Sequence, residues 1–424
     1  MLTRLKKRLH DASTPTVTLS ALVAAFLVYF CMYGLRKPFA AASFKGQSVH
    51  GLELKTALVI AQVVGYALSK FVSIRLLSEL PRQRRGLVLF ATLAAAEIAL
   101  LGVGLFGPAG QVLAMFCNGL PLGAVWGLVF AYLEGRRTSE LLGAGLSLSY
   151  IVSSGAVKSA GRYLLADGVA ERWMPALTGA LFFAAVLPLL WLLEALPEPS
   201  ELDRRERVER RPMTGVERRR FLRTFAPGLI ALVTLYVLLT AYRDFRDNFA
   251  VELWSALGYE KTPQILAVAE LPVALIVLLS LAAIFFVRDH RRAFFVVHAI
   301  MAGGAALIGA STWAYGAGLL PGSWWMVAVG AGLYMGYVPY GCVLFDRLLA
   351  LTQSAGTAVF LIYVADASGY AGSVLLLLYK NFGAPHFEYL PFFVRLSYGT
   401  AAVALAGFAL SAMYFARRAR LAWA

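Results

Sequence analysis

Long apolar segments recur along the chain and are separated by short stretches that carry charge, glycine or proline. Each segment is long enough for a helix of about 20 apolar residues, the length that crosses the hydrocarbon core of a bilayer. The pattern therefore predicts transmembrane helices rather than soluble elements. Twelve are expected, near residues 17–44, 53–80, 86–106, 110–133, 141–166, 175–196, 225–254, 263–287, 293–314, 322–345, 353–379 and 391–416.

The longest polar stretch, residues 197–224, lies between the sixth and seventh predicted helices. It predicts a six-helix bundle at 1–196, a charged cytoplasmic linker at 197–224 and a second six-helix bundle at 225–424. The alternative for the linker is binding to anionic lipid headgroups. We expect no cleavable signal, because Arg4–Arg8 leads into a long apolar segment without a small-residue cleavage site.

An internal repeat supports the division into halves. Two motifs recur at an offset of 213 residues: Gly119-Leu120-x-x-Gly123 as Gly332-Leu333-x-x-Gly336, and Tyr150-Ile151 as Tyr363-Val364. Related halves of this kind pack as two bundles around a central cavity near the midplane of the membrane. The predicted fold class is therefore an all-α membrane protein with twelve helices in two pseudo-symmetric six-helix bundles.

Composition agrees with a membrane protein, since 59% of the residues are hydrophobic, 15% are charged and the mean hydropathy is +0.69. One set of alternate loops, which includes both termini, holds 25 of the 39 Lys and Arg residues. The positive-inside rule places this set and both termini in the cytoplasm. The net charge of +15 follows from this orientation, and no aromatic-basic motif indicates nucleic acid. We expect a multi-pass monomer in the lipid bilayer of a bacterial inner membrane.

Some basic residues fall within or at the edge of predicted helices, where orientation does not explain them: Arg36, Lys37, Lys70, Arg75, Lys158, Arg162, Arg243, Arg246 and Arg395. A charge near the middle of a span costs roughly 2.5–3.5 kcal/mol on insertion scales unless it faces water or a counter-ion. Arg36 lies 19 residues after Val17, and Arg243 lies 18 residues after Phe225. The two arginines therefore have equivalent depths in the first helix of each half, and we expect both to point into the cavity.

A cavity that holds two arginines and several lysines favours an anionic solute. A planar guanidinium donates two parallel hydrogen bonds to phosphate or phosphonate oxygens, and Lys70 and Lys158 add point charges. Carboxylate or sulfate satisfies the same charges, so the residues indicate the sign of the solute and not its identity. The alternatives are snorkelling to the interface for Arg36, Lys37 and Lys70, and an ion pair with a carboxylate for Lys158.

Two acids, Glu270 and Asp366, fall inside the eighth and eleventh predicted helices. Intramembrane carboxylates often bind protons, so both are candidates for coupling. The alternative is that they neutralise cationic helices, and exchange against inorganic phosphate needs no proton. Several helix glycines are expected to permit close packing rather than to contact a solute: Gly143, Gly145, Gly155, Gly161, Gly332 and Gly336.

No catalytic constellation is visible in the sequence. Cys31, Cys117 and Cys342 stand singly in apolar segments, and the five histidines lack metal-ligand spacing and are expected to be loop or packing residues. We therefore expect no enzyme, no cofactor and no metal. Two rivals to a transporter are a membrane sensor that binds an organophosphate without moving it, and a membrane enzyme acting on lipid-linked phosphate, for which no nucleophile is visible.

Three features carry a family resemblance: Tyr29-x-x-x-Tyr33-x-x-Arg36-Lys37-x-Phe39, Tyr66-x-x-Ser69-Lys70-Phe71, and an arginine in the middle of the seventh helix. With the two-half layout, they resemble the organophosphate:phosphate antiporter branch of the major facilitator superfamily, which includes glycerol-phosphate and hexose-phosphate carriers. The resemblance implies that Arg36 and Arg243 clasp the phosphoryl group, that Lys70 assists and that Tyr29 and Tyr33 line the path. Transport would proceed by alternating access, without covalent chemistry.

Departures from this branch bear on the substrate and on coupling. The family's helix-five histidine has no counterpart near Tyr150–Gly155, and residues 73–82 follow the superfamily's Gly-x-x-x-Asp-Arg pattern only loosely. Lys158 and the acid-rich run Arg243-Asp-Phe-Arg-Asp-Asn248 give the cavity both signs of charge, which suits a zwitterion such as an aminoalkylphosphonate. Asn248 is accordingly a further candidate for substrate binding.

Overall fold

The structure is a computed structural model. It describes residues 2–78, 80–134, 138–199, 215–285, 289–352, 359–383 and 387–422, together with Arg136, Asp203 and Val287. Apart from a short antiparallel ladder of β1 (Ser48–Val49) and β2 (Leu52–Glu53), the described regular elements are helices. The expectation of an all-α protein is confirmed.

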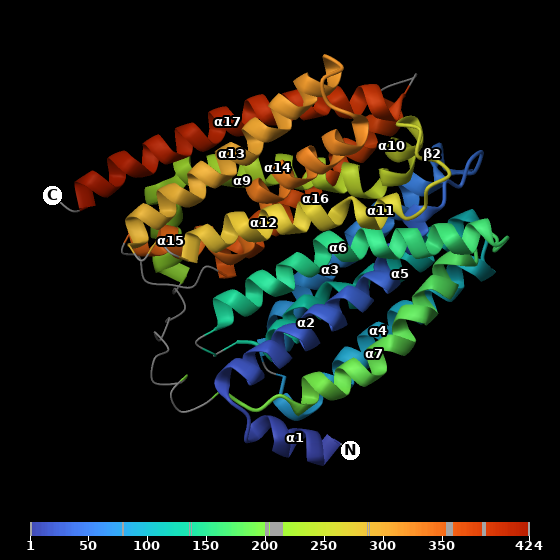
Figure 1. The fold of residues 1–424 in the computed structure, drawn as a ribbon, viewed down its shortest axis with the longest axis horizontal. Coiled ribbons are helices and arrows are strands. Elements are labelled where there is room, and N and C mark those ends of the chain that lie inside the picture. The colour runs from blue at the N-terminus through green and yellow to red at the C-terminus, as the bar shows by residue number, and fades with distance from the viewer. Residues whose placement is uncertain are drawn as a thin grey trace. The chain divides into compact units, whose positions relative to one another are not determined.

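The chain divides into two compact units, each described here by itself (Figure 1). The N-terminal unit comprises Met1–Arg207 and Asn248–Val268. Its elements after α1 (Leu2–His10) and besides the short ladder are α2 (Thr14–Arg36), η1 (Pro38–Ala41), α3 (Leu54–Ser78), α4 (Arg82–Leu105), α5 (Pro108–Phe130), α6 (Ser139–Ala166), α7 (Met174–Ala195), α10 (Ala250–Ala256) and α11 (Ile265–Val268).

The C-terminal unit comprises Val208–Asp247 and Ala269–Ala424. Its elements are α9 (Gly215–Asn248, without its last residue), α12 (Glu270–Phe285), α13 (His290–Gly316), α14 (Gly322–Cys342), α15 (Leu344–Leu351), α16 (Val359–Phe382) and α17 (Tyr389–Ala422). α9 therefore begins within the stretch that the sequence predicts as linker. Residues 200–202 and 204–214 of that stretch lie outside the described part of the chain.

Nine helices within the described residues are long and apolar enough to cross a membrane, or ten if α14 and α15, which meet at an angle of 55°, form one broken span. α3 and α16 occupy the positions of two further predicted spans. The outer faces of these helices are apolar. Exposed large hydrophobic side chains gather on α4 and α12, namely Leu87, Phe90, Ile98, Leu101, Leu105, Leu271, Leu275, Ile276, Leu278 and Leu279.

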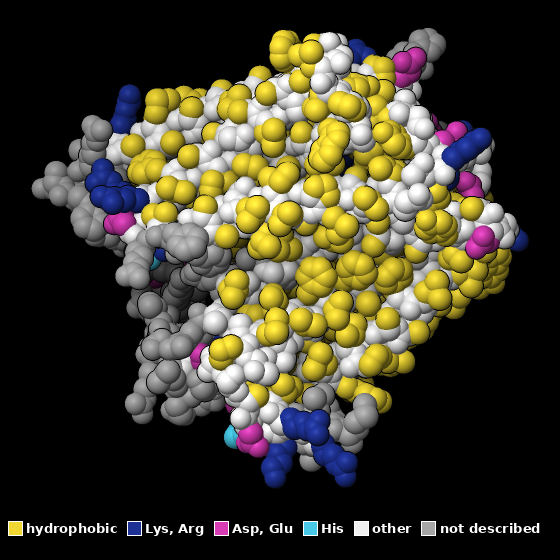
Figure 2. All heavy atoms as spheres, viewed as in Figure 1, with side chains coloured by type: hydrophobic (Ala, Val, Ile, Leu, Met, Phe, Trp, Pro, Cys, Tyr) yellow, Lys and Arg dark blue, Asp and Glu magenta, His cyan; other side chains and the backbone are white. Residues whose placement is uncertain are grey.

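Figure 2 shows hydrophobic side chains across the visible face of α12 and α6, whereas Lys and Arg side chains lie towards the margins of the view. An apolar exterior along the helices, with charges near their ends, is the distribution that a bilayer requires. The polar side chains that remain buried in each unit are therefore the ones that need a functional or structural explanation.

Small residues at two repeated positions let the helices approach closely. A Cβ on Gly119 of α5 would lie 2.3 Å from the Gln62 carbonyl oxygen of α3, and a Cβ on Gly332 of α14 would lie 2.4 Å from the Gly304 carbonyl oxygen of α13. Close packing is thus confirmed as the role of Gly332, and it extends to Gly119. A Cβ on Gly145 would similarly lie 2.1 Å from Leu22 Cδ1.

Candidate functional site

Arg36 and Lys70 of the N-terminal unit lie around one aromatic ring. Arg36 is the last residue of α2 and is 7% exposed. Its Cζ atom lies 4.1 Å from the ring centroid of Tyr66 and 5.6 Å from that of Tyr33, and Lys70 Nζ lies 5.4 Å from the Tyr66 centroid. At these distances the rings attract both cations. Two predicted site residues on different helices are therefore brought together, and we call Arg36, Lys70, Tyr33 and Tyr66 the Arg36 cluster.

Two amide side chains hold the end of α2 in place. The helix stops at Arg36 because Pro38 has no N–H to continue the ladder of hydrogen bonds. Gln62 Nε2 donates to the Arg36 carbonyl oxygen at 2.7 Å, and Asn118 Nδ2 donates to the Leu35 carbonyl oxygen at 3.0 Å. These bonds satisfy carbonyls that a helix end leaves without a partner in the helix.

The same amides join further helices to this position. Gln62 Nε2 also donates to Asn118 Oδ1 at 2.7 Å, and Asn118 Nδ2 donates to the Ala96 carbonyl oxygen of α4 at 2.9 Å. Both amides are buried. Three helices, α3, α4 and α5, are thus joined to the end of α2, which carries the predicted anion-binding guanidinium. Sequence reasoning missed Gln62 and Asn118, although an amide inside an apolar segment is itself a signal.

Other predicted residues of the N-terminal unit are also buried. The rings of Tyr29 and Tyr33 meet edge to face at 5.8 Å, and Tyr29 is 3% exposed. Lys158 on α6 is 3% exposed.

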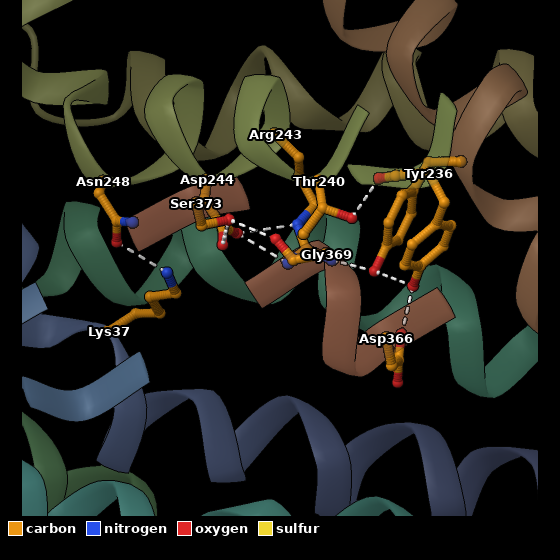
Figure 3. Close-up of polar contacts among 10 residues, drawn as sticks. Lys37, Tyr236, Thr240, Arg243, Asp244, Asn248, Asp366, Gly369 and Ser373 are labelled. Atoms are coloured by element: carbon orange, nitrogen blue, oxygen red, sulfur yellow. Dashed lines mark hydrogen bonds and ion pairs between the residues drawn. The ribbon is translucent and has the colours of Figure 1, made fainter. Parts of the chain in front are cut away.

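Lys37 and Asn248 form a direct contact. Lys37 Nζ donates to Asn248 Oδ1 at 2.9 Å, so the amide oxygen of this predicted substrate-binding residue is engaged by a lysine (Figure 3). Nearby in the chain, Lys55 Nζ donates to Glu252 Oε1 at 2.5 Å, and Ser159 Oγ donates to the Pro263 carbonyl oxygen at 2.8 Å. These contacts fasten the segment Asn248–Val268 to the rest of the N-terminal unit.

Arg243 of the C-terminal unit is paired with the acid that follows it. Its Nε and Nη2 donate to Asp244 Oδ1 at 3.0 and 2.7 Å, and Ser373 Oγ of α16 donates to Asp244 Oδ2 at 2.7 Å. The third guanidinium nitrogen, Nη1, donates to the hydroxyl of Tyr337 on α14, whose ring centroid lies 4.5 Å from Arg243 Cζ. The guanidinium is therefore held by side chains on both flanks.

Tyr337 connects Arg243, through Tyr236, to the predicted coupling residue Asp366. The hydroxyls of Tyr236 and Tyr337 are 2.8 Å apart, and the Tyr236 hydroxyl donates to Asp366 Oδ1. The two tyrosine rings stack with their centroids 5.0 Å apart. We call Arg243, Asp244, Tyr337, Tyr236 and Asp366 the Arg243 cluster. Sequence reasoning missed both tyrosines, because tyrosine is common in membrane helices and carries no charge to mark it.

Glu270, the other predicted coupling residue, forms an ion pair. Arg246 Nη1 lies 2.9 Å from Glu270 Oε1, and the two side chains are 5% and 11% exposed. Arg246 Nη2 also donates to the Met326 carbonyl oxygen at 3.1 Å. This geometry supports the alternative that Glu270 neutralises a cationic helix.

The remaining intramembrane cations have separate surroundings. Arg162 Nη2 donates to the Glu260 carbonyl oxygen at 3.2 Å, and Arg395 is exposed, with its Nε 3.3 Å from the Pro391 carbonyl oxygen. The side chain of Arg75 lies outside the described residues. Among the residues that the structure describes, no group of three or more His, Cys, Asp and Glu side chains could hold a metal ion.

Comparison with solved structures gives the fold type. The chain is similar to the nucleoside transporter NupG (TM-score 0.57, 14% identity, 93% of this chain and 98% of that one) and to a D-xylose-proton symporter (0.60, 14%, 93% and 97%). It is also similar to the POT family transporter PepTSo (0.60, 14%, 97% and 99%). These proteins have the major facilitator fold, which confirms the fold that the resemblance implies.

Sequence comparison is less specific about function. No curated protein matches the chain. A family model described as "Family of unknown function (DUF5690)" matches residues 38–418, which is most of the 424-residue chain and includes the Arg243 cluster and most of α3 to α17. The chain therefore belongs to this family of unknown function and has the major facilitator fold.

Proposed function

We propose that the protein is a secondary transporter that moves a small organic anion, an organophosphate or a phosphonate, across the membrane by alternating access. Support for transport comes from the fold, which the chain shares with solved structures of a nucleoside transporter, a D-xylose-proton symporter and a POT family transporter. Two units of helices with apolar outer faces are the parts that such a mechanism moves.

The observation that carries the choice of an anion is the Arg36 cluster. Arg36 and Lys70 lie within 4.1 and 5.4 Å of the same Tyr66 ring centroid, on helices with apolar outer faces. Arg36 is buried and Lys70 is partly exposed, and both lie beside the same ring. An anion bound beside Tyr66 would be attracted by both positive charges, so the Arg36 cluster supports an anionic substrate.

A phosphoryl or phosphonyl group fits this chemistry best. The Arg36 guanidinium presents a planar set of donors that matches two oxygens of a tetrahedral anion, and Lys70 supplies a point charge. In the C-terminal unit, Arg243 is accompanied by Asp244 and Asp366. Both signs of charge near Arg243 favour a substrate with an ammonium group as well, such as an aminoalkylphosphonate.

The resemblance to the organophosphate:phosphate antiporter branch suggests roles for individual residues. We propose that Arg36 and Arg243 contact the phosphoryl group, that Lys70 and Lys158 add positive charge, and that Tyr29 and Tyr33 line the path. Asn248 contributes through Lys37, whose ammonium donates a hydrogen bond to the Asn248 amide oxygen. The bilayer is expected to be a bacterial inner membrane with both termini in the cytoplasm, and inorganic phosphate or a proton is the expected coupling ion.

Ligand-induced thermal stabilisation of the purified protein tests the anion site. We expect phosphate, glycerol phosphate, hexose phosphates or 2-aminoethylphosphonate to raise the unfolding temperature more than sulfate or acetate does. Arg36→Ala should weaken the binding of the stabilising compound roughly 10- to 100-fold, because a hydrogen bond to a charged group contributes about 1.5–3 kcal/mol. Arg243→Ala should weaken it in the same direction.

The matched control is Arg395→Ala, which removes an exposed arginine from a helix of the C-terminal unit. This variant should bind as the wild type does. No stabilisation by any phosphorus compound, or equal stabilisation of the wild type, Arg36→Ala and Arg243→Ala, would contradict the proposed substrate class. The rival function, a sensor that binds the same anion without moving it, gives the same result here and differs only in flux.

A further inference from the structure

The Arg243 cluster contains a continuous chain of hydrogen bonds that ends on a carboxylate (Figure 3). Arg243 Nη1 donates to the Tyr337 hydroxyl, the Tyr337 and Tyr236 hydroxyls are 2.8 Å apart, and the Tyr236 hydroxyl donates to Asp366 Oδ1. The chain runs through three helices, α9, α14 and α16, of the C-terminal unit. Its two ends are a predicted anion-binding residue and a predicted coupling residue.

Each tyrosine hydroxyl has one hydrogen, and this fixes the direction of the chain. When Asp366 is ionised it can only accept, so the Tyr236 hydrogen points to Asp366 and the Tyr337 hydrogen points to Tyr236. Arg243 donates to Tyr337. When Asp366 carries a proton it can donate to Tyr236 instead, and the hydrogens of both tyrosines turn towards Arg243. The Tyr337 hydrogen is then available to an anionic oxygen held beside Arg243.

The charges in the cluster favour the same coupling. The cluster contains one guanidinium, Arg243, and two carboxyl groups, Asp244 and Asp366, and Asp244 is already paired with Arg243. The titratable groups near Arg243 and Asp366 include Asp244 and Tyr236 on α9, Tyr334 and Tyr337 on α14 and Tyr370 on α16. Arg246 is paired with Glu270. An anion beside Arg243 is repelled less when Asp366 carries a proton than when it is ionised.

We infer that Asp366 takes up one proton when an anion binds beside Arg243, and that Tyr236 and Tyr337 link the two events through their hydrogen bonds. The proton comes from the aqueous phase, forms one O–H bond on the Asp366 carboxylate and returns to water when the anion leaves. The hydroxyl hydrogens of the tyrosines rotate and stay on their own oxygens. The inference rests on the proposed function and deepens it, because it makes a proton the coupling ion.

Proton uptake on anion binding tests the inference. The purified wild type is mixed with glycerol phosphate or 2-aminoethylphosphonate in weakly buffered detergent solution, and a pH-indicator dye reports protons taken up. We expect about one proton per bound anion, so that affinity falls up to tenfold for each unit of pH increase. Asp366→Asn has a neutral side chain, so this variant should still bind the anion but take up no proton. Any change in the protonation of the probe itself is the same in all variants and cancels when they are compared.

Tyrosine variants separate the relay from general effects of the cluster. Tyr236→Phe interrupts the chain and should reduce proton uptake to less than half of the wild-type value. The control is Tyr340→Phe, because the Tyr340 ring contacts Tyr236 with centroids 4.8 Å apart but its hydroxyl donates to the Leu232 carbonyl oxygen. This variant should keep the wild-type uptake. Tyr337→Phe interrupts the same chain and replaces Tyr236→Phe if that variant does not fold.

The outcomes distinguish this inference from the proposed function. Binding of either compound without proton uptake, or uptake that persists in Asp366→Asn, would overturn the inference and leave the anion site standing. Equal uptake in the Tyr236 and Tyr340 variants would overturn the relay. Failure of both compounds to bind the wild type would overturn the proposed substrate class and the inference together.

Discussion

Arg246 and Glu270 show how a buried charge is kept inside one unit by an ion pair. The guanidinium and the carboxylate are 2.9 Å apart, and Glu270 is the first residue of α12. A Cβ on Gly330 of α14 would lie 2.6 Å from Arg246 Nη2, so the facing helix presents backbone rather than a side chain to the guanidinium. We therefore propose that Glu270 stabilises the C-terminal unit, whereas Asp366 stays the proposed coupling residue.

Removal of the Glu270 charge should destabilise the protein. Glu270→Gln leaves the Arg246 guanidinium buried without a counter-charge, and loss of one partner of a buried pair costs about 3–5 kcal/mol. Unfolding in detergent, followed by tryptophan fluorescence or circular dichroism, measures the change. Asp366→Asn is the comparison, because a tyrosine hydroxyl donates a hydrogen bond to that carboxylate. A larger loss of stability in Asp366→Asn than in Glu270→Gln would reverse the two assignments.

The sequence predicts which side chains are unusual better than it predicts what they contact. Arg36 and Lys70 stand out because a charge in an apolar segment needs an explanation, and the structure places both beside Tyr66. The hydrogen-bond partners that hold the end of α2 in place are not predicted in this way. Asn118 donates to Leu35 from 83 residues away, and no local pattern indicates a contact over that separation.

At the scale of helices, the apolar pattern predicts that a helix is present better than it predicts the residues at which the helix begins and ends. The first predicted span runs to residue 44, but α2 stops at Arg36 and is followed by η1, because Pro38 cannot continue the ladder. The seventh predicted span, 225–254, is α9 and α10 with a break at Phe249. Apolar residues continue through both breaks, so hydropathy alone does not show them.

Helix packing at Gly119 offers a direct test of the close approach between α5 and α3. Gly119→Ala would place a Cβ 2.3 Å from the backbone oxygen of Gln62, and a backbone atom cannot turn aside as a side chain can. We expect a loss of about 1–3 kcal/mol in unfolding free energy, as for other overpacked cores, measured by thermal unfolding. Gly399→Ala is the matched control, because no atom lies within 4 Å of its Cβ position. Equal stability of the two variants would argue against a tight contact at Gly119.

At the scale of the whole molecule, the chain order and the compact units differ in one segment. The sequence divides the chain at 197–224, yet Asn248–Val268, from the second half, belongs by its contacts to the N-terminal unit. Lys37 and Lys55 supply two of these contacts, to Asn248 and Glu252. The sequence does not predict either lysine as a partner of this segment, because the residues around a lysine do not show whether its side chain is solvated or paired.

The two clusters also differ in charge. The Arg36 cluster contains two cations and two aromatic rings, whereas the Arg243 cluster contains one cation and two acids. By itself the Arg36 cluster therefore favours an anionic group, and by itself the Arg243 cluster favours a group that carries both signs of charge.

Exchange across a membrane is the measurement that tests the central claim most directly. Purified protein is reconstituted into liposomes that contain unlabelled glycerol phosphate, phosphate or 2-aminoethylphosphonate, and entry of the same labelled compound is followed. We predict saturable uptake that falls at least tenfold in Arg36→Gln and is unchanged in Arg395→Ala. Binding without uptake would identify a sensor instead of a transporter, and uptake that is the same in wild type and Arg36→Gln would contradict the proposed anion site.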